Sequence, residues 1–109
     1  MAQFCVPGTK IGGFCHTPAV SLAEKIHPRK ALEMLLLAED VPAREAERIG
    51  LVNRVVAPEL LEATVTAMAE KVAAASIFNM QMGKKAFYEQ TRKPSIEEKY
   101  ATAKEYMSV

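Results

Sequence analysis

The stretch Ala43–Val56, AREAERIGLVNRVV, decides how this chain is expected to fold. In its first part, charged residues surround Ala46 and Ile49, which fall on the inward face of a short helix. Gly50 follows at the position where a helix end favours a left-handed residue. The remaining residues, LVNRVV, are rich in valine and typical of a strand. The stretch therefore predicts a short helix followed directly by a strand.

Two further helices are predicted on the N-terminal side of this stretch. Pro28 lacks the amide hydrogen that a continuing helix needs, so it separates a helix that opens at Thr17 from a second one over 29–37. We expect the Thr17 hydroxyl to cap the first helix, with a proline next to it at the first helical position. The second helix is apolar almost all round after Glu33, which predicts burial on several sides.

The segment Phe4–Val20, FCVPGTKIGGFCHTPAV, concentrates loop-forming and reactive residues near one end of the chain. Residues 3–6 favour a strand that stops at the turn Pro7-Gly8, and the chain then loops through Gly12-Gly13. Such a segment commonly places a ligand or a catalytic group. A phosphate-bearing ligand at the following helix start, near Thr17, is one possibility, because free amide groups point outward there.

Four side chains in the first part of the chain raise the possibility of a metal site or a Cys/His nucleophile: Cys5, Cys15, His16 and His27. Their spacing fits no compact zinc pattern, in which ligands of a pair lie two to four residues apart. A nucleophile would need a base and an orienting group beside the thiolate, and the sequence marks out neither. Buried cysteines and a histidine at a helix end are the simpler interpretation.

The region after Pro58 is expected to be entirely helical. Pro58 opens what is predicted to be the longest helix, a second helix covers 79–90, and Ser95 with Glu98 forms a capping box for a last helix that ends at Met107. Two apolar stripes at helical spacing predict core or subunit-contact surfaces. Their members are Leu61, Val65, Met68, Val72 and Ile96, Tyr100, Ala103, Met107.

The whole chain is therefore predicted to be mainly α with two short strands, which cannot form a stable sheet without partners from elsewhere. Fourteen basic and thirteen acidic residues in 109 give no charge excess that would indicate a nucleic-acid partner. No apolar run approaches the roughly 18 residues of a membrane span. Two cysteines are too few for a disulfide framework, which favours a soluble intracellular protein with free thiols.

The order of these features resembles the crotonase (enoyl-CoA hydratase/isomerase) superfamily. FCVPG is similar to the family's F-x-x-P turn, and TKIGGFCHTPAVSLAEKI to the loop and helix that follow it. The most specific match is PRKALEMLLLAEDVPAREAERIGLVNRVV, which resembles the segment that ends in "A-x-E-A-x-x-x-G-L-V-x-x-V-V". MGKKAFYEQ is similar to a later family helix. The resemblance covers almost all of the chain.

The resemblance implies the C-terminal part of a ClpP/crotonase-type α/β spiral fold plus a helical trimerisation region. Residues 1–57 would form the last part of the core, with a strand, an acyl-pocket loop, helices and a strand. Residues 58–109 would form a C-terminal helical oligomerisation region, which in the family builds trimers or dimers of trimers. The expected partners are an acyl-CoA, further copies of the chain or a full-length paralogue, with no nucleic acid and no membrane.

The resemblance also implies which chemical groups the chain carries. Family members hold a thioester carbonyl in an oxyanion hole, while carboxylates move protons. The oxyanion donors and the first catalytic glutamate are expected in the part of the fold that precedes Met1. At the place of the second glutamate this sequence has Gly8, so we expect no catalytic residue, no metal and no cofactor other than the coenzyme A thioester as substrate.

The substrate-binding residues that the resemblance implies form a short set. On the acyl side they are Gly8, Ile11, Gly12 and Phe14, and at the adenine end of CoA it is Tyr106. Tyr106 sits about a quarter-turn off the apolar stripe of its helix, in agreement with that role. Lys84 and Lys85 would approach the CoA phosphates or form an ordinary solvated face.

Three functions are consistent with these observations. The first is a C-terminal fragment of an enoyl-CoA hydratase/isomerase-family protein that acts on acyl-CoA thioesters in fatty-acid metabolism. The isolated chain would not be catalytic, and the expected location is the cytoplasm or the mitochondrial matrix. The second is a non-catalytic trimerisation or assembly module. The third is a free-standing helical domain unrelated to crotonases, against which the 43–56 block speaks.

Overall fold

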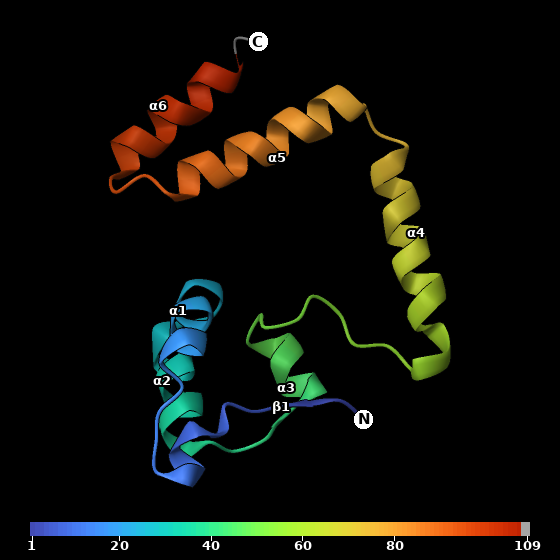
Figure 1. Cartoon of the computed structure of the whole chain (residues 1–109). Helices are drawn as coiled ribbons and strands as arrows, with labels where there is room; N and C mark the ends of the chain where they lie inside the picture. The colour runs from blue at the N-terminus through green and yellow to red at the C-terminus, as the bar shows by residue number, and fades with distance from the viewer. Residues whose placement is uncertain (108–109) are drawn as a thin grey trace. The chain divides into compact units, whose positions relative to one another are not determined.

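The secondary structure of the protein, seen in a computed structural model that describes residues 1–107, is mainly helical (Figure 1). The chain divides into two units, Met1–Ala57 and Pro58–Val109. The first contains β1 (Gln3–Phe4), the 3-10 helix η1 (Pro7–Ile11), α1 (His16–Lys25), α2 (Pro28–Leu37), β2 (Val41–Pro42) and α3 (Ala43–Arg48). The second contains η2 (Pro58–Leu60), α4 (Leu61–Ala73), α5 (Ile77–Thr91) and α6 (Ile96–Met107). The prediction of a mainly α chain with short strands is confirmed.

The core of the first unit lies where α2, α3 and the small sheet meet. β1 and β2 pair antiparallel, with Gln3 opposite Pro42 and Phe4 opposite Val41. The buried residues that form one cluster are Ile26, Ala31, Met34, Val41 and Ala46. Ala46 is fully buried and Ile49 packs against this cluster, as the pattern of the AREAERIG segment predicts.

Ion pairs tie the outer side of α3 to α2. Arg48 donates two hydrogen bonds to the Glu45 carboxylate, at 2.7 and 2.5 Å, and Lys30 of α2 lies 3.6 Å from the same carboxylate. The hydrogen bonds from Arg48 hold the pKa of Glu45 below its usual range. Because Arg48 is exposed and Lys30 and Glu45 are only half-buried, solvent screens these pairs, and we expect them to orient the helices more than to stabilise them.

The prediction of a strand over Leu51–Val56 is wrong. After α3 the backbone passes through Gly50, which has a φ of 81°, and the amides of Leu51 and Val52 then donate to the Ala46 carbonyl at 2.8 and 3.3 Å. The segment forms bends and irregular backbone. The predicted left-handed glycine is confirmed, but the valines lack a neighbouring strand, and β2 forms at Val41–Pro42 instead.

A carboxylate missed by the sequence pattern holds the irregular segment in place. The Val55 amide donates a 2.7 Å hydrogen bond to Glu47 Oε2. A charge-assisted bond of this kind contributes about 1.5–3 kcal/mol. We therefore expect Glu47→Ala to raise the hydrogen-exchange rate of the Val55 amide about tenfold or more, measured by NMR. Glu39→Ala is the matched control, and equal exchange in the two variants would contradict the assignment.

The boundary of α1 and the burial of α2 differ from the predictions. α1 begins at His16, with Cys15 as its N-cap and no capping side chain, so Thr17 lies inside the first turn instead of capping it. Proline fits the first turn of a helix at several positions, and the sequence alone therefore left the start uncertain by a residue or two. On α2, Leu32, Leu36 and Leu37 are each more than half exposed, so only one side of the helix is buried in this chain.

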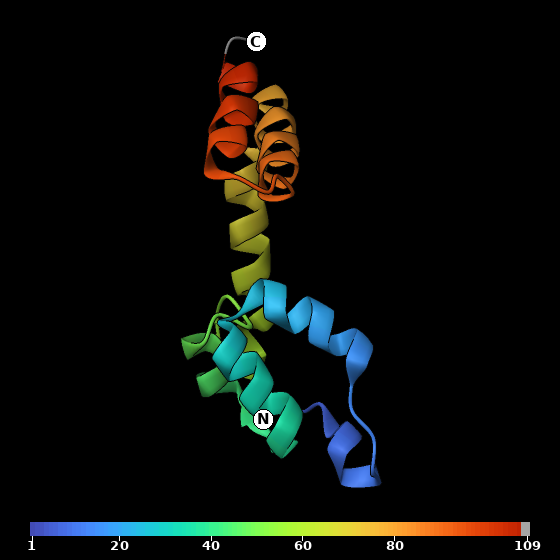
Figure 2. The ribbon, with the colours of Figure 1, turned by 90° about the vertical axis from the view of Figure 1, so that its left-hand side faces the viewer.

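In the second unit, α5 and α6 run side by side in opposite directions, as both views show (Figures 1 and 2). The predicted capping box before α6 is confirmed, since the Glu98 amide donates to Ser95 Oγ at 3.2 Å and the Ser95 amide donates to Glu98 Oε2 at 3.3 Å. The longest helix is α5 with 15 residues and not the helix after Pro58, because the first turn there is the 3-10 helix η2. No residue of α4 is buried.

Within residues 1–107, no helix combines the length and the hydropathy that crossing a membrane requires.

Candidate functional site

The loop that holds the predicted acyl-side residues is closed on itself by two contacts to Gly8. The Gly8 amide donates a hydrogen bond to Cys15 Sγ at 3.2 Å, and the Gly13 amide donates to the Gly8 carbonyl at 2.9 Å. Gly12 ends η1 with a φ of 79°, a left-handed conformation that favours glycine. The turn from η1 into α1 therefore brings Gly8 directly against Cys15.

A glycine is needed at position 8 because neighbouring atoms leave no room for a Cβ atom, and not because of a positive φ. A Cβ atom at this position would lie 2.8 Å from the Cys15 amide nitrogen, 2.9 Å from Cys15 Sγ and 2.9 Å from the Phe14 carbonyl carbon. Two of these atoms belong to the backbone and cannot rotate away. The position thus admits no side chain in this loop conformation. The Cα–Cβ bond of any residue other than glycine would point toward residues 14 and 15 of the same loop.

The other acyl-side residues lie on the same turn with different exposure. Ile11 is 88% exposed, so its side chain has no apolar neighbours that would bury it. Phe14 is half-buried and contacts the His16 ring, with 5.0 Å between ring centroids. The structure therefore brings Gly8, Ile11, Gly12 and Phe14 onto one loop.

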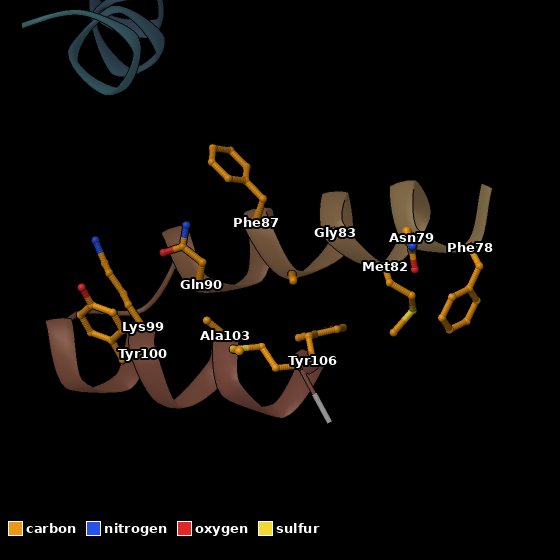
Figure 3. A pocket seen from close by; sticks show the side chains of 12 residues that line it. Phe78, Asn79, Met82, Gly83, Phe87, Gln90, Lys99, Tyr100, Ala103 and Tyr106 are labelled. Atoms are coloured by element: carbon orange, nitrogen blue, oxygen red, sulfur yellow. The ribbon is translucent and has the colours of Figure 1, made fainter. Parts of the chain in front are cut away.

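In the second unit, a groove of about 560 Å³ runs between α5 and α6 (Figure 3). Met82 extends from α5 toward α6, while Lys99 and Phe78 mark opposite ends of the groove. Its size and its mostly apolar lining are typical of small-molecule sites. The lining residues are Phe78, Asn79, Met82, Gly83, Ala86, Phe87, Gln90, Lys99, Tyr100, Ala103, Tyr106 and Met107. The apolar stripe predicted for α6 thus contributes three of its residues to the groove wall.

Tyr106, the predicted adenine-side residue, is held by a carboxylate from the facing helix. Its hydroxyl donates a 2.5 Å hydrogen bond to Glu89 Oε2 on α5. This bond, together with partial burial and the negative charges of Glu89 and Glu105, raises the pKa of Tyr106 to about 12. The phenol is therefore a fixed, neutral donor over the whole physiological pH range.

The bond to Glu89 predicts that the α5–α6 hairpin loses stability at high pH. The folded-state pKa of Tyr106, about 12, lies above the unfolded value of about 10. The stabilisation is thus complete below pH 10 and is lost as the pH rises through 12. We expect a fall in the melting temperature between these values, measured by circular dichroism. Tyr106→Phe should show a smaller fall in this window, and an identical fall would contradict the prediction.

The cysteines and lysines singled out from the sequence have the following surroundings. Among residues 1–107, no group of three or more His, Cys, Asp or Glu side chains could hold a metal ion. Cys5 and Cys15 are free thiols, and Cys5 donates to the Ala38 carbonyl at 3.3 Å. Lys85 forms an ion pair with Glu89 at 4.0 Å, and neither Lys84 nor Lys85 is among the residues that line the groove.

Two side chains with a clear effect on the site were missed by the sequence pattern. Glu89 lies 17 residues from its partner Tyr106. The only sequence feature that could have indicated this pair is the prediction of two consecutive helices, which can pack against each other. Cys15 lies seven residues from Gly8, and no local spacing predicts that its sulfur fills the space beside the glycine.

Comparison with known families gives this geometry a context. The sequence model described as Enoyl-CoA hydratase/isomerase matches residues 1–109. The chain therefore belongs to the enoyl-CoA hydratase/isomerase family, and the predicted crotonase resemblance is confirmed.

Within the family, the chain is similar to enoyl-CoA hydratase domain-containing 3 proteins. The rat relative, "Enoyl-CoA hydratase domain-containing protein 3, mitochondrial", is 43% identical over 89 residues, which are 82% of this chain and 30% of that protein. The crystal structure of the human domain-containing protein 3 matches with a TM-score of 0.89 at 34% identity, over 98% of this chain and 42% of the other. An enoyl-CoA hydratase structure from Mycobacterium smegmatis matches with a TM-score of 0.91 at 42% identity, over 98% and 41%. The chain spans less than half of the length of each.

Proposed function

We propose that this chain supplies one wall of an acyl-CoA pocket in an enoyl-CoA hydratase/isomerase-family protein of fatty-acid metabolism, and that the isolated chain does not catalyse hydration. The wall is the loop with Gly8, Ile11, Gly12 and Phe14, which we assign to the acyl side. Tyr106 of the second unit is assigned separately, to the adenine end of a CoA. The family membership and the names of the relatives support an acyl-CoA ligand. "Mitochondrial" in the relative's name supports the matrix rather than the cytoplasm.

The observation that carries the non-catalytic part is the closed loop at Gly8. A second catalytic glutamate would have to project from this position, where even a Cβ atom approaches two backbone atoms within 2.9 Å. Proton transfer to or from a ligand needs a positioned side chain with a suitable pKa. Within the loop 7–15, the titratable side chains are Lys10 and Cys15, and the Cys15 sulfur accepts the Gly8 amide.

The test uses the whole 109-residue chain and two measurements. Crotonyl-CoA hydration should stay far below usual enzyme turnover, about 1–1,000 per second. Octanoyl-CoA binding, measured by calorimetry, should be detectable and weakened by Tyr106→Ala, whereas Tyr88→Ala on α5 is the matched control. Turnover in the usual range would overturn the non-catalytic part. Equal affinities of the two variants would overturn the role of Tyr106.

A second candidate function is a non-catalytic trimerisation or assembly module. The exposed apolar stripe on α4 favours it, because a row of apolar side chains at helical spacing is typical of a contact surface. Light scattering of the chain, alone and with a full-length paralogue, tests it. We expect association that Val65→Glu weakens and Thr66→Glu, one residue along the same helix, does not. A monomer that ignores the paralogue would contradict this function.

A further inference from the structure

Four observations meet at the contact between Glu89 and Tyr106. The phenol hydroxyl has a single proton, and Glu89 Oε2 accepts it at 2.5 Å. Tyr106 is half-buried and lines the groove, whereas Glu89 is not among the lining residues. Glu89 is in turn paired with Lys85 at 4.0 Å. The Glu89 carboxylate is thus linked to the groove by its hydrogen bond to the tyrosine.

We propose that Glu89 is a positioning residue of the acyl-CoA site: it fixes Tyr106 so that the ring, and not the hydroxyl, faces the ligand. This inference rests on the proposed function, because it concerns which part of an acyl-CoA the groove at Tyr106 binds. The fixed ring limits the groove to an uncharged portion of the acyl-CoA.

The chemistry of the groove wall supports this selection. Because its O–H group donates to Glu89, the phenol has no donor left for a phosphate oxygen. The negative charges of Glu89 and Glu105 that act on Tyr106 repel an anion at the same place. The cationic lining residue, Lys99, lies at one end of the groove and not beside Tyr106 (Figure 3). An aromatic face with apolar neighbours is left as the contact surface.

Fixing the ring before the ligand arrives lowers the cost of binding. An aromatic side chain that is already held in place loses less conformational freedom when a ligand is bound. Removal of the acceptor should therefore weaken binding even though Glu89 does not touch the ligand. Replacement of the phenol hydroxyl by hydrogen should remove the positioning effect of Glu89 on the ring.

The first measurement is the affinity of the full chain for octanoyl-CoA by calorimetry. We expect Tyr106→Ala to bind about tenfold more weakly and Glu89→Ala about threefold more weakly. Glu89→Gln keeps an acceptor oxygen and should bind like the wild type. In a Tyr106→Phe background, Glu89→Ala should cause no further loss. Glu62→Ala on α4 is the matched control, and additive losses in the double variant would overturn the proposal.

A second measurement decides the positioning role without a ligand. NMR contacts from the Tyr106 ring to the other side chains that line the groove should be present in the wild type and in Glu89→Gln, and be lost in Glu89→Ala. The pKa of Tyr106 should fall toward about 10 in both Glu89 variants. Circular dichroism confirms that the helices remain. A ring that stays fixed in Glu89→Ala would overturn the proposal.

The two measurements separate the failure of this inference from the failure of the proposed function. If the wild-type chain does not bind octanoyl-CoA while the ring is released in Glu89→Ala, the proposed function fails and the positioning role stands. If octanoyl-CoA binds and Glu89→Ala binds it equally well, the positioning role fails and the proposed function stands. Inorganic pyrophosphate serves as a charged probe. If it competes with octanoyl-CoA in the wild type but not in Tyr106→Ala, the groove binds a charged group, and the proposal that it takes an uncharged portion of the acyl-CoA is overturned.

Discussion

Gly8→Glu is expected to destabilise the first unit by about 3 kcal/mol and to create no hydratase activity. The added Cβ would lie within 2.9 Å of the Cys15 nitrogen and the Phe14 carbonyl carbon, so the loop has to open before the side chain fits. Opening it breaks the hydrogen bonds from Gly8 to Cys15 and from Gly13 to Gly8. A unit of this size has a small total stability, so a change of 3 kcal/mol is a large share of it.

The measurement for Gly8→Glu is denaturation in urea, followed by NMR amide signals of the first unit. Gly8→Ala should show more than half of the effect, because the Cβ atom alone causes the overlap. Gly13→Ala is the matched control in the same loop, since its Cβ would lie 3.5 Å from the Gly8 carbonyl oxygen, an ordinary contact. Equal stability of the Gly8 and Gly13 variants would show that the loop accepts a side chain at position 8.

Met34→Ala is the second change with a large expected effect, about 2–4 kcal/mol of lost stability. Met34 is 4% exposed and belongs to the cluster that joins α2, β2 and α3. Truncation removes apolar contacts on several sides and leaves a cavity, because the neighbouring helices relax only in part.

Leu36→Ala is the matched control for Met34→Ala, because Leu36 lies on the same helix and is 55% exposed. We expect it to cost less than about 1 kcal/mol in the free chain. Urea denaturation of both variants gives the comparison. If the two variants were destabilised equally, the buried side of α2 would not be the one that the structure shows.

The features that could be predicted from the sequence are those with a local cause. Pro28 removes a backbone donor and separates α1 from α2. Ser95 and Glu98 satisfy each other's backbone amides within four residues. Gly50 takes the left-handed conformation that follows α3. Each of these depends on neighbouring residues alone, and each is found where the sequence placed it.

The features that could not be predicted depend on groups far along the chain or on missing neighbours. The valines after Gly50 have strand propensity, but a strand needs a partner, and the Ala46 carbonyl and the Glu47 carboxylate take their amides instead. The exposure of Leu36 and of α4 depends on what else covers them. Gly8 in the first unit and Tyr106 in the second were singled out from the sequence, while their respective partners Cys15 and Glu89 were not.

The contact between Gly8 and Cys15 also limits the order in which this loop can change over generations. A glutamate codon at position 8 is harmful for as long as the backbone at residues 14 and 15 keeps its present course. A carboxylate at position 8 therefore requires a second change, in the turn around Cys15. Positions 8 and 15 are thus coupled, and a side chain at the first requires a different backbone at the second.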